Sequence, residues 1–160
     1  MAEIKIFPTE YLVSLFRGKT KYGSWIIGDL LQYANTAQIW TQEEHGKCNY
    51  IVDLATVGQF IGETDKNNKK IFKGDITELT LENGEIRRFV VDIRTVTRTL
   101  VSHPDFDDET AKVQITGVVF LWQGYELFPC IDSNGASDVS KMEVIGNIHD
   151  NPELMKEESE

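Results

Sequence analysis

The sequence predicts a β-rich fold of the α+β or all-β class. Apolar and polar residues alternate in short segments such as 76–81, a pattern typical of strands with one buried face. Compact turn signals separate these segments, and Asn83-Gly84 is the strongest short hairpin signal among them. The chain has 160 residues, of which 41% are apolar, so it is long enough for a sizeable hydrophobic core.

The N-terminal part of the chain offers three strand candidates. Residues 25–31 have strand composition, with Gly28 inside the segment, which is typical of a bulge or a close backbone approach. Residues 37–40 are the expected return strand, and residues 50–54 are a further strand. The polar stretch 41–49 is predicted to be a loop.

The central segment carries the clearest pattern. Residues 56–61 have strand composition, and residues 65–70 form a predicted turn in which Asn tolerates the left-handed backbone. The Asn-Gly hairpin signal then leads into a returning strand at residues 88–93. We therefore expect residues 57–93 to form a small barrel or a strongly bent sheet, with the N- and C-terminal segments packed on it.

The C-terminal part is predicted to hold further strands and a short helix. Residues 113–122 are a long strand candidate that pairs with residues 125–131, and residues 142–148 form another strand. Asn151 is the expected N-cap of a short C-terminal helix, with Pro152 at its first position.

We predict one domain spanning residues 1–160. Residues 1–14 are interpreted as an N-terminal addition and residues 94–112 as an insertion that includes an acidic loop. The acidic tail 156–160 is expected to fray into solvent.

The composition of the chain disfavours several classes of function. The net charge of −10 disfavours a protein built to grip a phosphate backbone, because such domains replace counterions with Lys and Arg. Cys48 and Cys130 are interpreted as free, buried and inert thiols in a reducing compartment. The first residues show no secretory pattern and no apolar run reaches membrane-span length, so a cytoplasmic location is expected.

Three sequence blocks, in this order, together resemble the YopX-like family of phage and prophage proteins. They are residues 16–19 with Trp25 and 28–31, residues 56–62 with 65–67 and 71–76, and residues 143–148 followed by 151–154. The resemblance implies a small protein encoded on a phage, prophage or related mobile element, with a β-rich fold and self-association. It supplies no catalytic residues and no ligand.

The chain departs from the family pattern at a few places. Asn68 stands where the family usually has Gly in the turn, and His149 stands where it tends to have an aromatic residue. Residues 94–112 have no matching counterpart, and the residues before Leu15 are additional.

Residues that could carry chemistry have structural explanations. Asp75 follows Gly74 and precedes an alternating strand, so a turn role is favoured over a role as an acid or a metal ligand. His45, His103 and His149 are far apart in sequence and lack the spacing of a metal site.

Catalytic motifs are not evident. The sequence has no Gly-x-Ser-x-Gly, no phosphate-binding loop and no dinucleotide fingerprint. The acidic cluster at residues 105–109 lacks the closing Glu of a calcium loop and is predicted to be a solvated loop. We therefore expect no enzyme, no cofactor and no metal.

The large aromatic residues are predicted to form the core, because aromatic side chains dominate core burial. The set is Trp25, Trp40, Phe89, Phe120 and Trp122. An exposed subset would instead mark an interface, and the two alternatives stay open at this point.

A local basic cluster surrounds the predicted turn at residues 65–70. The candidate partner surface consists of Phe60, Lys66, Lys69, Lys70 and Lys73. Lysines at a hairpin turn also serve solubility and discourage edge pairing, which is the simpler explanation.

We predict a non-catalytic phage or prophage accessory protein that binds a host or phage protein partner, with homo-oligomer formation as a further expectation. The alternative is a nucleic-acid-associated, barrel-like module that uses these lysines with Phe60 or Phe72. No membrane association is expected.

Overall fold

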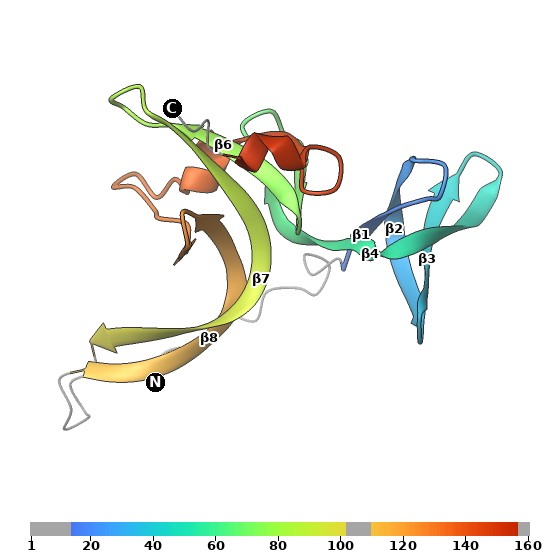
Figure 1. Cartoon of the computed structure of the whole chain (residues 1–160), viewed down its shortest axis with the longest axis horizontal. Coiled ribbons are helices and arrows are strands. Elements are labelled where there is room, and N and C mark those ends of the chain that lie inside the picture. The colour runs from blue at the N-terminus through green and yellow to red at the C-terminus, as the bar shows by residue number, and fades with distance from the viewer. Residues whose placement is uncertain (1–13, 102–109, 157–160) are drawn as a thin grey trace. The chain divides into compact units, whose positions relative to one another are not determined.

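The computed structural model describes residues 14–101 and 110–156. It divides into two compact units, with the boundary between Gly74 and Asp75. The β-rich class is confirmed, since ten strands and two short 3₁₀ turns make up the regular structure of the described residues (Figure 1). The prediction of one domain with an N-terminal addition, an insertion and a frayed tail stays a prediction.

The first unit contains five antiparallel strands that include a closed ring. β1 pairs with both β2 and β4, β2 pairs with β3, and β3 pairs with β4, while β5 adds to the far end of β4. The strands are β1 (Phe16–Lys19), β2 (Trp25–Tyr33), β3 (Thr36–Glu43), β4 (Gly46–Thr64) and β5 (Lys70–Phe72). A small barrel is therefore present, but β1–β4 form it and not the central segment 57–93, which is divided between the two units.

β4 closes the ring because it is long enough to pair with two different strands along its length. It pairs with β3 up to Val52 and with β1 from Asp53 onward. The register shifts at this changeover, and Thr56 holds it: its hydroxyl accepts from the Lys19 N–H at 2.8 Å and donates to the Asp53 carbonyl at 2.7 Å. Such an irregularity lets a strand bend sharply.

The barrel is small, and glycine makes its closure feasible. A Cβ on Gly28 would lie 2.0 Å from the Trp40 carbonyl oxygen, so only a residue without a side chain fits there. This confirms the predicted close backbone approach at Gly28. The interior holds Ala37, Ile39 and Val52, with partly buried apolar residues around them.

The second unit is a five-stranded antiparallel sheet in the order β10-β6-β7-β8-β9. Its strands are β6 (Asp75–Thr80), β7 (Ile86–Val101), β8 (Thr110–Trp122), β9 (Tyr125–Leu127) and β10 (Glu143–Asn147). β7 and β8 pair without a break from Val90↔Leu121 to Val101↔Thr110 and curve together as one long hairpin (Figure 1). A bent sheet is thus present, but it is formed by strands between Asp75 and Asn147 and not by residues 57–93.

Aromatic side chains dominate the core of the second unit. Phe89 and Phe120 meet edge-to-face with ring centroids 6.1 Å apart, and Val91 and Val119 are fully buried beside them on β7 and β8. Below the sheet, the 3₁₀ turn Asp138–Lys141 contributes the buried Val139. The predicted core role of these two phenylalanines is confirmed.

The same five-residue turn occurs four times among the described residues. In each, the first N–H donates to the fifth carbonyl and the fourth N–H donates to the first carbonyl. The fourth residue has a positive φ of 90° at Gly23, 61° at Asn68, 84° at Gly84 and 80° at Gly135. The turns span residues 20–24, 65–69, 81–85 and 132–136. The predicted turns at 65–70 and Asn83-Gly84 are confirmed.

Two local predictions are wrong. Residues 41–49 are not a loop, because β3 and β4 continue through them and leave only Glu44 and His45 as a tight turn. Polar side chains on the outer face of a small barrel mimic a loop in sequence. The C-terminal helix is only the 3₁₀ turn Pro152–Met155; Asn151 does stand at its N-cap position with Pro152 in the first turn, as predicted, but its Oδ1 makes no cap bond and accepts instead from the Asn147 N–H at 3.4 Å.

The predicted insertion and the chain ends lie partly beyond the described residues. Residues 94–101 and 110–112 belong to the paired strands β7 and β8. The acidic cluster 105–109, His103, most of the N-terminal addition and most of the acidic tail fall outside the described ranges.

Candidate functional site

The outer side of the barrel carries an unusual set of apolar side chains. Side chains alternate across a strand, so residues next to the buried Ala37, Ile39 and Val52 point outward. The register aligns Leu31, Gln38 and Ile51 in one row across β2, β3 and β4, and Ile51 is 71% exposed. We call the exposed set Ile27, Leu31, Tyr33, Trp40 and Ile51 the barrel face.

The barrel face includes one of the large aromatic residues that the sequence predicts to lie in the core. Trp40, which the sequence places in the core, lies at the surface on β3, in register with Asp29 and Asn49. The Asn49 amide donates to the Gln38 carbonyl oxygen at 3.0 Å, so a polar pair lies among the apolar side chains. Exposed apolar side chains gathered on one face and bordered by polar groups are typical of interaction surfaces.

A cleft of about 850 Å³ borders the barrel face. One wall is the end of β1 and the following turn, and the other wall is β4; the lining residues are Lys19, Thr20, Lys21, Tyr22, Asn49, Tyr50, Ile51, Val52, Asp53 and Thr56. Tyr22 is 83% exposed, and the Lys21 ammonium lies 4.9 Å from the centre of its ring. We call this feature the β4 cleft.

A titratable cluster lies where β3 and β4 pair, and its Tyr50 also lines the β4 cleft. The Tyr50 hydroxyl donates to the Glu43 carboxylate, and this bond, with burial, raises the pKa of Tyr50. Burial, followed by the charge of Glu43, raises the pKa of the Cys48 thiol. A raised thiol pKa keeps Cys48 protonated and unreactive near neutral pH. Cys48 is half-buried, but Cys130 is exposed, contrary to the expectation that both are buried.

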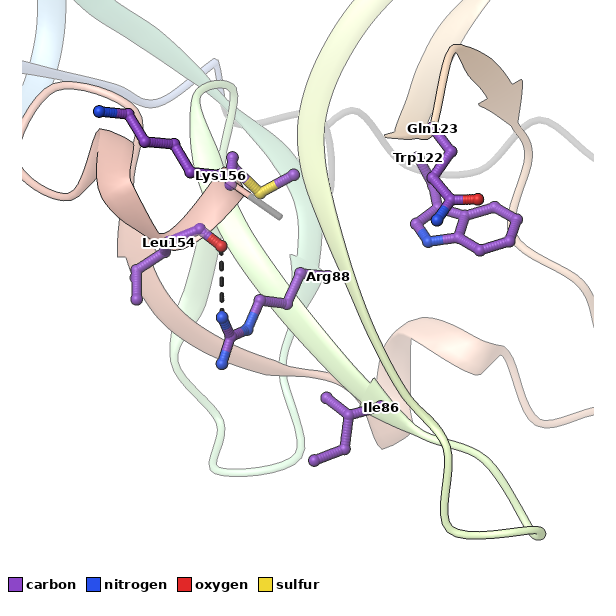
Figure 2. Close-up of a pocket in the computed structure, with 7 residues that line it drawn as sticks. Ile86, Arg88, Trp122, Gln123, Leu154 and Lys156 are labelled. Atoms are coloured by element: carbon purple, nitrogen blue, oxygen red, sulfur yellow. Dashed lines mark hydrogen bonds between the residues drawn. The ribbon is translucent and has the colours of Figure 1, made fainter. Parts of the chain in front are cut away.

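The second unit has its own cleft of about 530 Å³ beside the C-terminal turn (Figure 2). The side chain of Arg88 points from β7 toward the Leu154 carbonyl and donates to it at 3.3 Å. The same guanidinium pairs with Glu78 at 3.0 Å. Trp122 on the other side is stacked on Tyr125 and covered by the Arg87 guanidinium at 4.6 Å. The groups in this cleft are already engaged in contacts within the unit.

Comparison with known families adds an independent result. A family model described as YopX protein matches residues 15–156. The chain belongs to the YopX protein family. No match was found among curated proteins.

The YopX match bears on the resemblance drawn from the sequence blocks. It confirms the family over nearly the whole chain, including the blocks at the two ends. The position of Asn68 is instructive, since the structure puts it in the left-handed conformation that Gly adopts in the equivalent turns. The departure from the family pattern therefore retains the backbone of the turn.

The predicted partner residues lie together in this YopX-family chain. Lys66, Lys69 and Lys70 are exposed on the turn after β4, Lys73 is exposed after β5, and Phe60 is half-buried on β4. Phe72, the other aromatic considered, is only 2% exposed and packs on Phe60 and on the Arg17 guanidinium. Phe72 is thus part of the core and its ring faces are already in contact.

The structure also shows where the other candidate acidic and histidine residues lie. Asp75 is buried at the start of β6, in register with Asn147, so it is a strand residue and the turn before it lies at Lys73 and Gly74. His45 and His149 are exposed in separate turns. Among residues 14–101 and 110–156, no three His, Cys, Asp or Glu side chains gather as a metal site would need. No helix in these ranges has the length and apolar character to cross a membrane.

The sequence analysis missed the barrel face and the β4 cleft. The signal that could have indicated them is present in β2, where apolar residues occur on both faces, as in Trp25–Tyr33. A strand that is apolar on both sides has a second surface to cover, either in a core or in an interface.

Proposed function

We propose that this YopX-family protein is a non-catalytic accessory protein of a phage or prophage that binds a host or phage protein through the barrel face. The observation that carries the proposal is the set of five large apolar side chains exposed on one side of β2–β4. A fully exposed side chain of this size gains roughly 1.5–3 kcal/mol when it moves out of water, and these side chains, which are between 37% and 71% exposed, gain a corresponding part of that. A protein partner that covers several of them would thus be bound favourably.

The proposal also rests on the chemistry of the surrounding surface. The barrel face contains aromatic residues, which are enriched at the centres of protein interfaces. Polar side chains such as Asp29, Gln38 and Asn49 border them and supply hydrogen-bonding groups. The phage or prophage context is what the YopX-like resemblance implies, and we carry it as part of the proposal.

Nucleic-acid binding through the lysine turn is the second candidate. Four exposed lysines within eight positions of sequence favour it, since Lys side chains neutralise phosphates. The net charge of −10 and the burial of Phe72 weigh against it, because the most suitable ring for base stacking is covered.

Affinity capture with matched variants tests the proposal. The tagged full chain is incubated with host lysate, with and without nuclease, and the captured material is identified by mass spectrometry. The test variant is Tyr33→Ser/Ile51→Ser on the barrel face, and the control is Tyr125→Ser/Ile131→Ser. The control removes the same residue types at similar exposure, as Ile51 and Ile131 are both 71% exposed.

We expect a stoichiometric protein that survives nuclease treatment, is lost with the barrel-face variant and is retained by the control. Retention of that protein by the barrel-face variant would refute this surface as the binding site. Capture of nucleic acid that Lys69→Glu/Lys70→Glu abolishes would favour the second candidate. A wild-type dimer that the barrel-face variant converts to a monomer would show that the partner is a second copy of the chain.

A further inference from the structure

Along the first half of β4, one edge has no pairing strand among residues 14–101 and 110–156. β3 and β4 are joined by a two-residue turn, with Glu43 opposite Gly46. Hydrogen-bonded pairs alternate along an antiparallel ladder, so Gly46, Cys48, Tyr50 and Val52 bond to β3. The N–H and C=O groups of Lys47, Asn49 and Ile51 consequently point the other way, and no described residue pairs with them there.

β1 does not cover this edge. It pairs with β4 only from Asp53 onward, and after Lys19 the chain turns away. The turn at residues 20–24 is fixed by its own bonds, from the Thr20 N–H to the Ser24 carbonyl at 2.8 Å and from the Gly23 N–H to the Thr20 carbonyl at 2.9 Å. The β4 cleft lies in the space left between this turn and the edge of β4.

We propose that the β4 cleft binds an extended, acidic-apolar segment of the partner protein, which adds a strand to the free edge of β4. The inference rests on the proposed function and gives the partner's chemistry and mode of binding. An extended peptide offers alternating N–H and C=O groups that complement those of Lys47, Asn49 and Ile51. A strand rises about 3.3 Å per residue, so the edge from Lys47 to Ile51 can pair with about five residues of the partner.

Charge and side-chain contacts favour acidic residues in that segment. Lys19 and Lys21 line the wall opposite β4, and Lys47 is exposed on the edge itself. The carboxylate of Asp53 is the one acidic group in the lining, and its Oδ1 accepts from the Ala55 N–H at 3.0 Å. Tyr22 and Ile51 supply apolar surface for side chains that alternate with the acidic ones.

Strand addition is not proposed at the lysine turn, residues 66–73. Its cations surround a hairpin turn whose backbone groups are bonded internally, from the Asp65 N–H to the Lys69 carbonyl and from the Asn68 N–H to the Asp65 carbonyl. The β4 cleft differs in combining cations, an apolar floor and unpaired strand groups.

The test uses synthetic peptides and the full chain. The probe is a fluorescein-labelled seven-residue peptide that alternates Val and Glu, with blocked ends, titrated by fluorescence anisotropy. Comparison peptides replace Glu with Lys, or carry N-methyl groups on alternate amides in either of the two phases. N-methylation removes donors from the peptide without altering the protein, so the test stays valid if a protein variant misfolds.

We expect saturable binding of the Glu peptide, weakened by at least about tenfold in the Lys peptide and in one N-methylated phase. Ile51→Pro removes one edge N–H and should weaken binding by a similar factor, whereas Ile51→Ala keeps the N–H and should weaken it less. Lys19→Glu/Lys21→Glu should also weaken binding, and Lys112→Glu in the second unit should not. Amide chemical shifts should change at Lys47, Asn49 and Ile51.

Absence of saturable binding would overturn the inference, as would equal affinity for the Val-Glu peptide and both N-methylated peptides. Equal affinity for the Lys peptide would overturn the acidic specificity. The experiments distinguish failure of this inference from failure of the proposed function. If capture depends on the barrel face but no peptide binds, strand addition is wrong and the proposed function stands. If peptides bind at β4 but no protein is captured through the barrel face, the proposed function fails.

Discussion

The two units of this chain enclose their apolar residues in different ways. In the first, β1–β4 close into a small ring whose interior has space for Ala37, Ile39 and Val52. In the second, the long β7–β8 hairpin curves around larger groups, among them Phe89 and Phe120. A small barrel has little interior volume, so a strand sequence rich in apolar residues leaves part of them outside. The second unit also leaves large apolar side chains exposed, among them Val101, Tyr125 and Ile131. The barrel is the candidate interaction surface because Leu31 and Ile51 align in one row on either side of Gln38.

The two units also differ in how closely neighbouring backbone atoms approach the glycines of their strands. In the barrel, Gly28 and Gly58 face carbonyl oxygens of neighbouring segments at 2.0 Å and 2.3 Å from an added Cβ. In the open sheet, a Cβ on Gly117 would meet only the Phe128 ring at 3.8 Å, an ordinary contact. Closure of the barrel therefore depends on the absence of a side chain at Gly28, whereas Gly117 in the curved β7–β8 pair has space for one.

The largest expected effect is on the aromatic core of the second unit. Phe120→Ala should lower the free energy of unfolding by about 4 kcal/mol, because it removes a buried ring and leaves a cavity beside Phe89. Urea denaturation followed by circular dichroism measures the loss. Ile39→Val in the barrel is the comparison, with an expected loss of about 1 kcal/mol. A Phe120→Ala loss no larger than that of Ile39→Val would contradict the central role of this ring.

The next effect tests barrel closure. Gly28→Ala should cost about 3 kcal/mol, since the new Cβ would overlap the Trp40 backbone and force the strands apart. Gly117→Ala is the matched control in the open sheet, where we expect a change within about 0.5 kcal/mol. Thermal unfolding of the two variants makes the comparison. Equal losses would mean that closure does not depend on glycine at position 28.

The repeated turn allows a comparison between the units. The Asp65 carboxylate is buried and accepts from the Asn67 and Lys69 N–H groups at 2.8 Å and 2.9 Å. Asp65→Ala leaves these donors without that acceptor and should cost about 2 kcal/mol. Asp132 makes the same bonds to Asn134 and Ala136 at 2.9 Å but is more exposed, so Asp132→Ala should cost less. Denaturant titration would refute this ranking if the order were reversed.

A smaller effect concerns the residue with a positive φ in the turn at residues 65–69. Asn68 has a φ of 61°, a conformation that Gly adopts without steric cost. Asn68→Gly should therefore be neutral or raise the free energy of unfolding by about 0.5 kcal/mol, and Asn68→Val should lower it by about 1 kcal/mol. Differential scanning calorimetry of both variants checks the sign, and a stabilising Asn68→Val would contradict the assigned backbone.

The smallest effect is a pH dependence in the second unit. Backbone donation from Ala136, then Lys141 and the Asn134 N–H, lowers the pKa of Asp132 below its ordinary value of 3.8. A lowered folded-state pKa means that the carboxylate stabilises the fold above pH 3.8 and that this contribution is lost as pH falls through the folded-state pKa. The difference in unfolding free energy between wild type and Asp132→Asn should therefore shrink between about pH 6 and about pH 3. A difference that stays constant over this range would exclude the linkage.

Much of the local structure could be predicted from the sequence. Residues 65–70, Asn83-Gly84 and Asn134-Gly135 form turns because Asn, Asp and Gly supply local hydrogen bonds and a positive φ wherever they occur. The alternating segment 76–81 forms β6, and the hydrophobic run 113–122 lies within β8. Of these segments, the turn at residues 65–70 is the one that the blocks behind the family assignment include in large part, and that assignment is confirmed over residues 15–156.

The candidate site could not be predicted in the same way. The lysines near residue 70 are conspicuous in the sequence, but the barrel face combines three residues of β2 with one residue each of β3 and β4. Ile51 and Leu31 are separated by two turns and meet in one row only because β3 lies between them in register. Asn151 shows the same limit on a small scale, since Asn147 competes with the helix for its side chain.

The sequence by itself determined the β-rich class, the turns and the family of this protein, because each depends on interactions between residues close along the chain. The tertiary structure decided which strands close the barrel, where the chain divides and which apolar residues remain exposed. β4 shows the physical reason: its bend at Thr56 sets both the partner of each half and the edge left open at Lys47, Asn49 and Ile51. Such long-range pairings are selected by packing and closure, and no short segment encodes them.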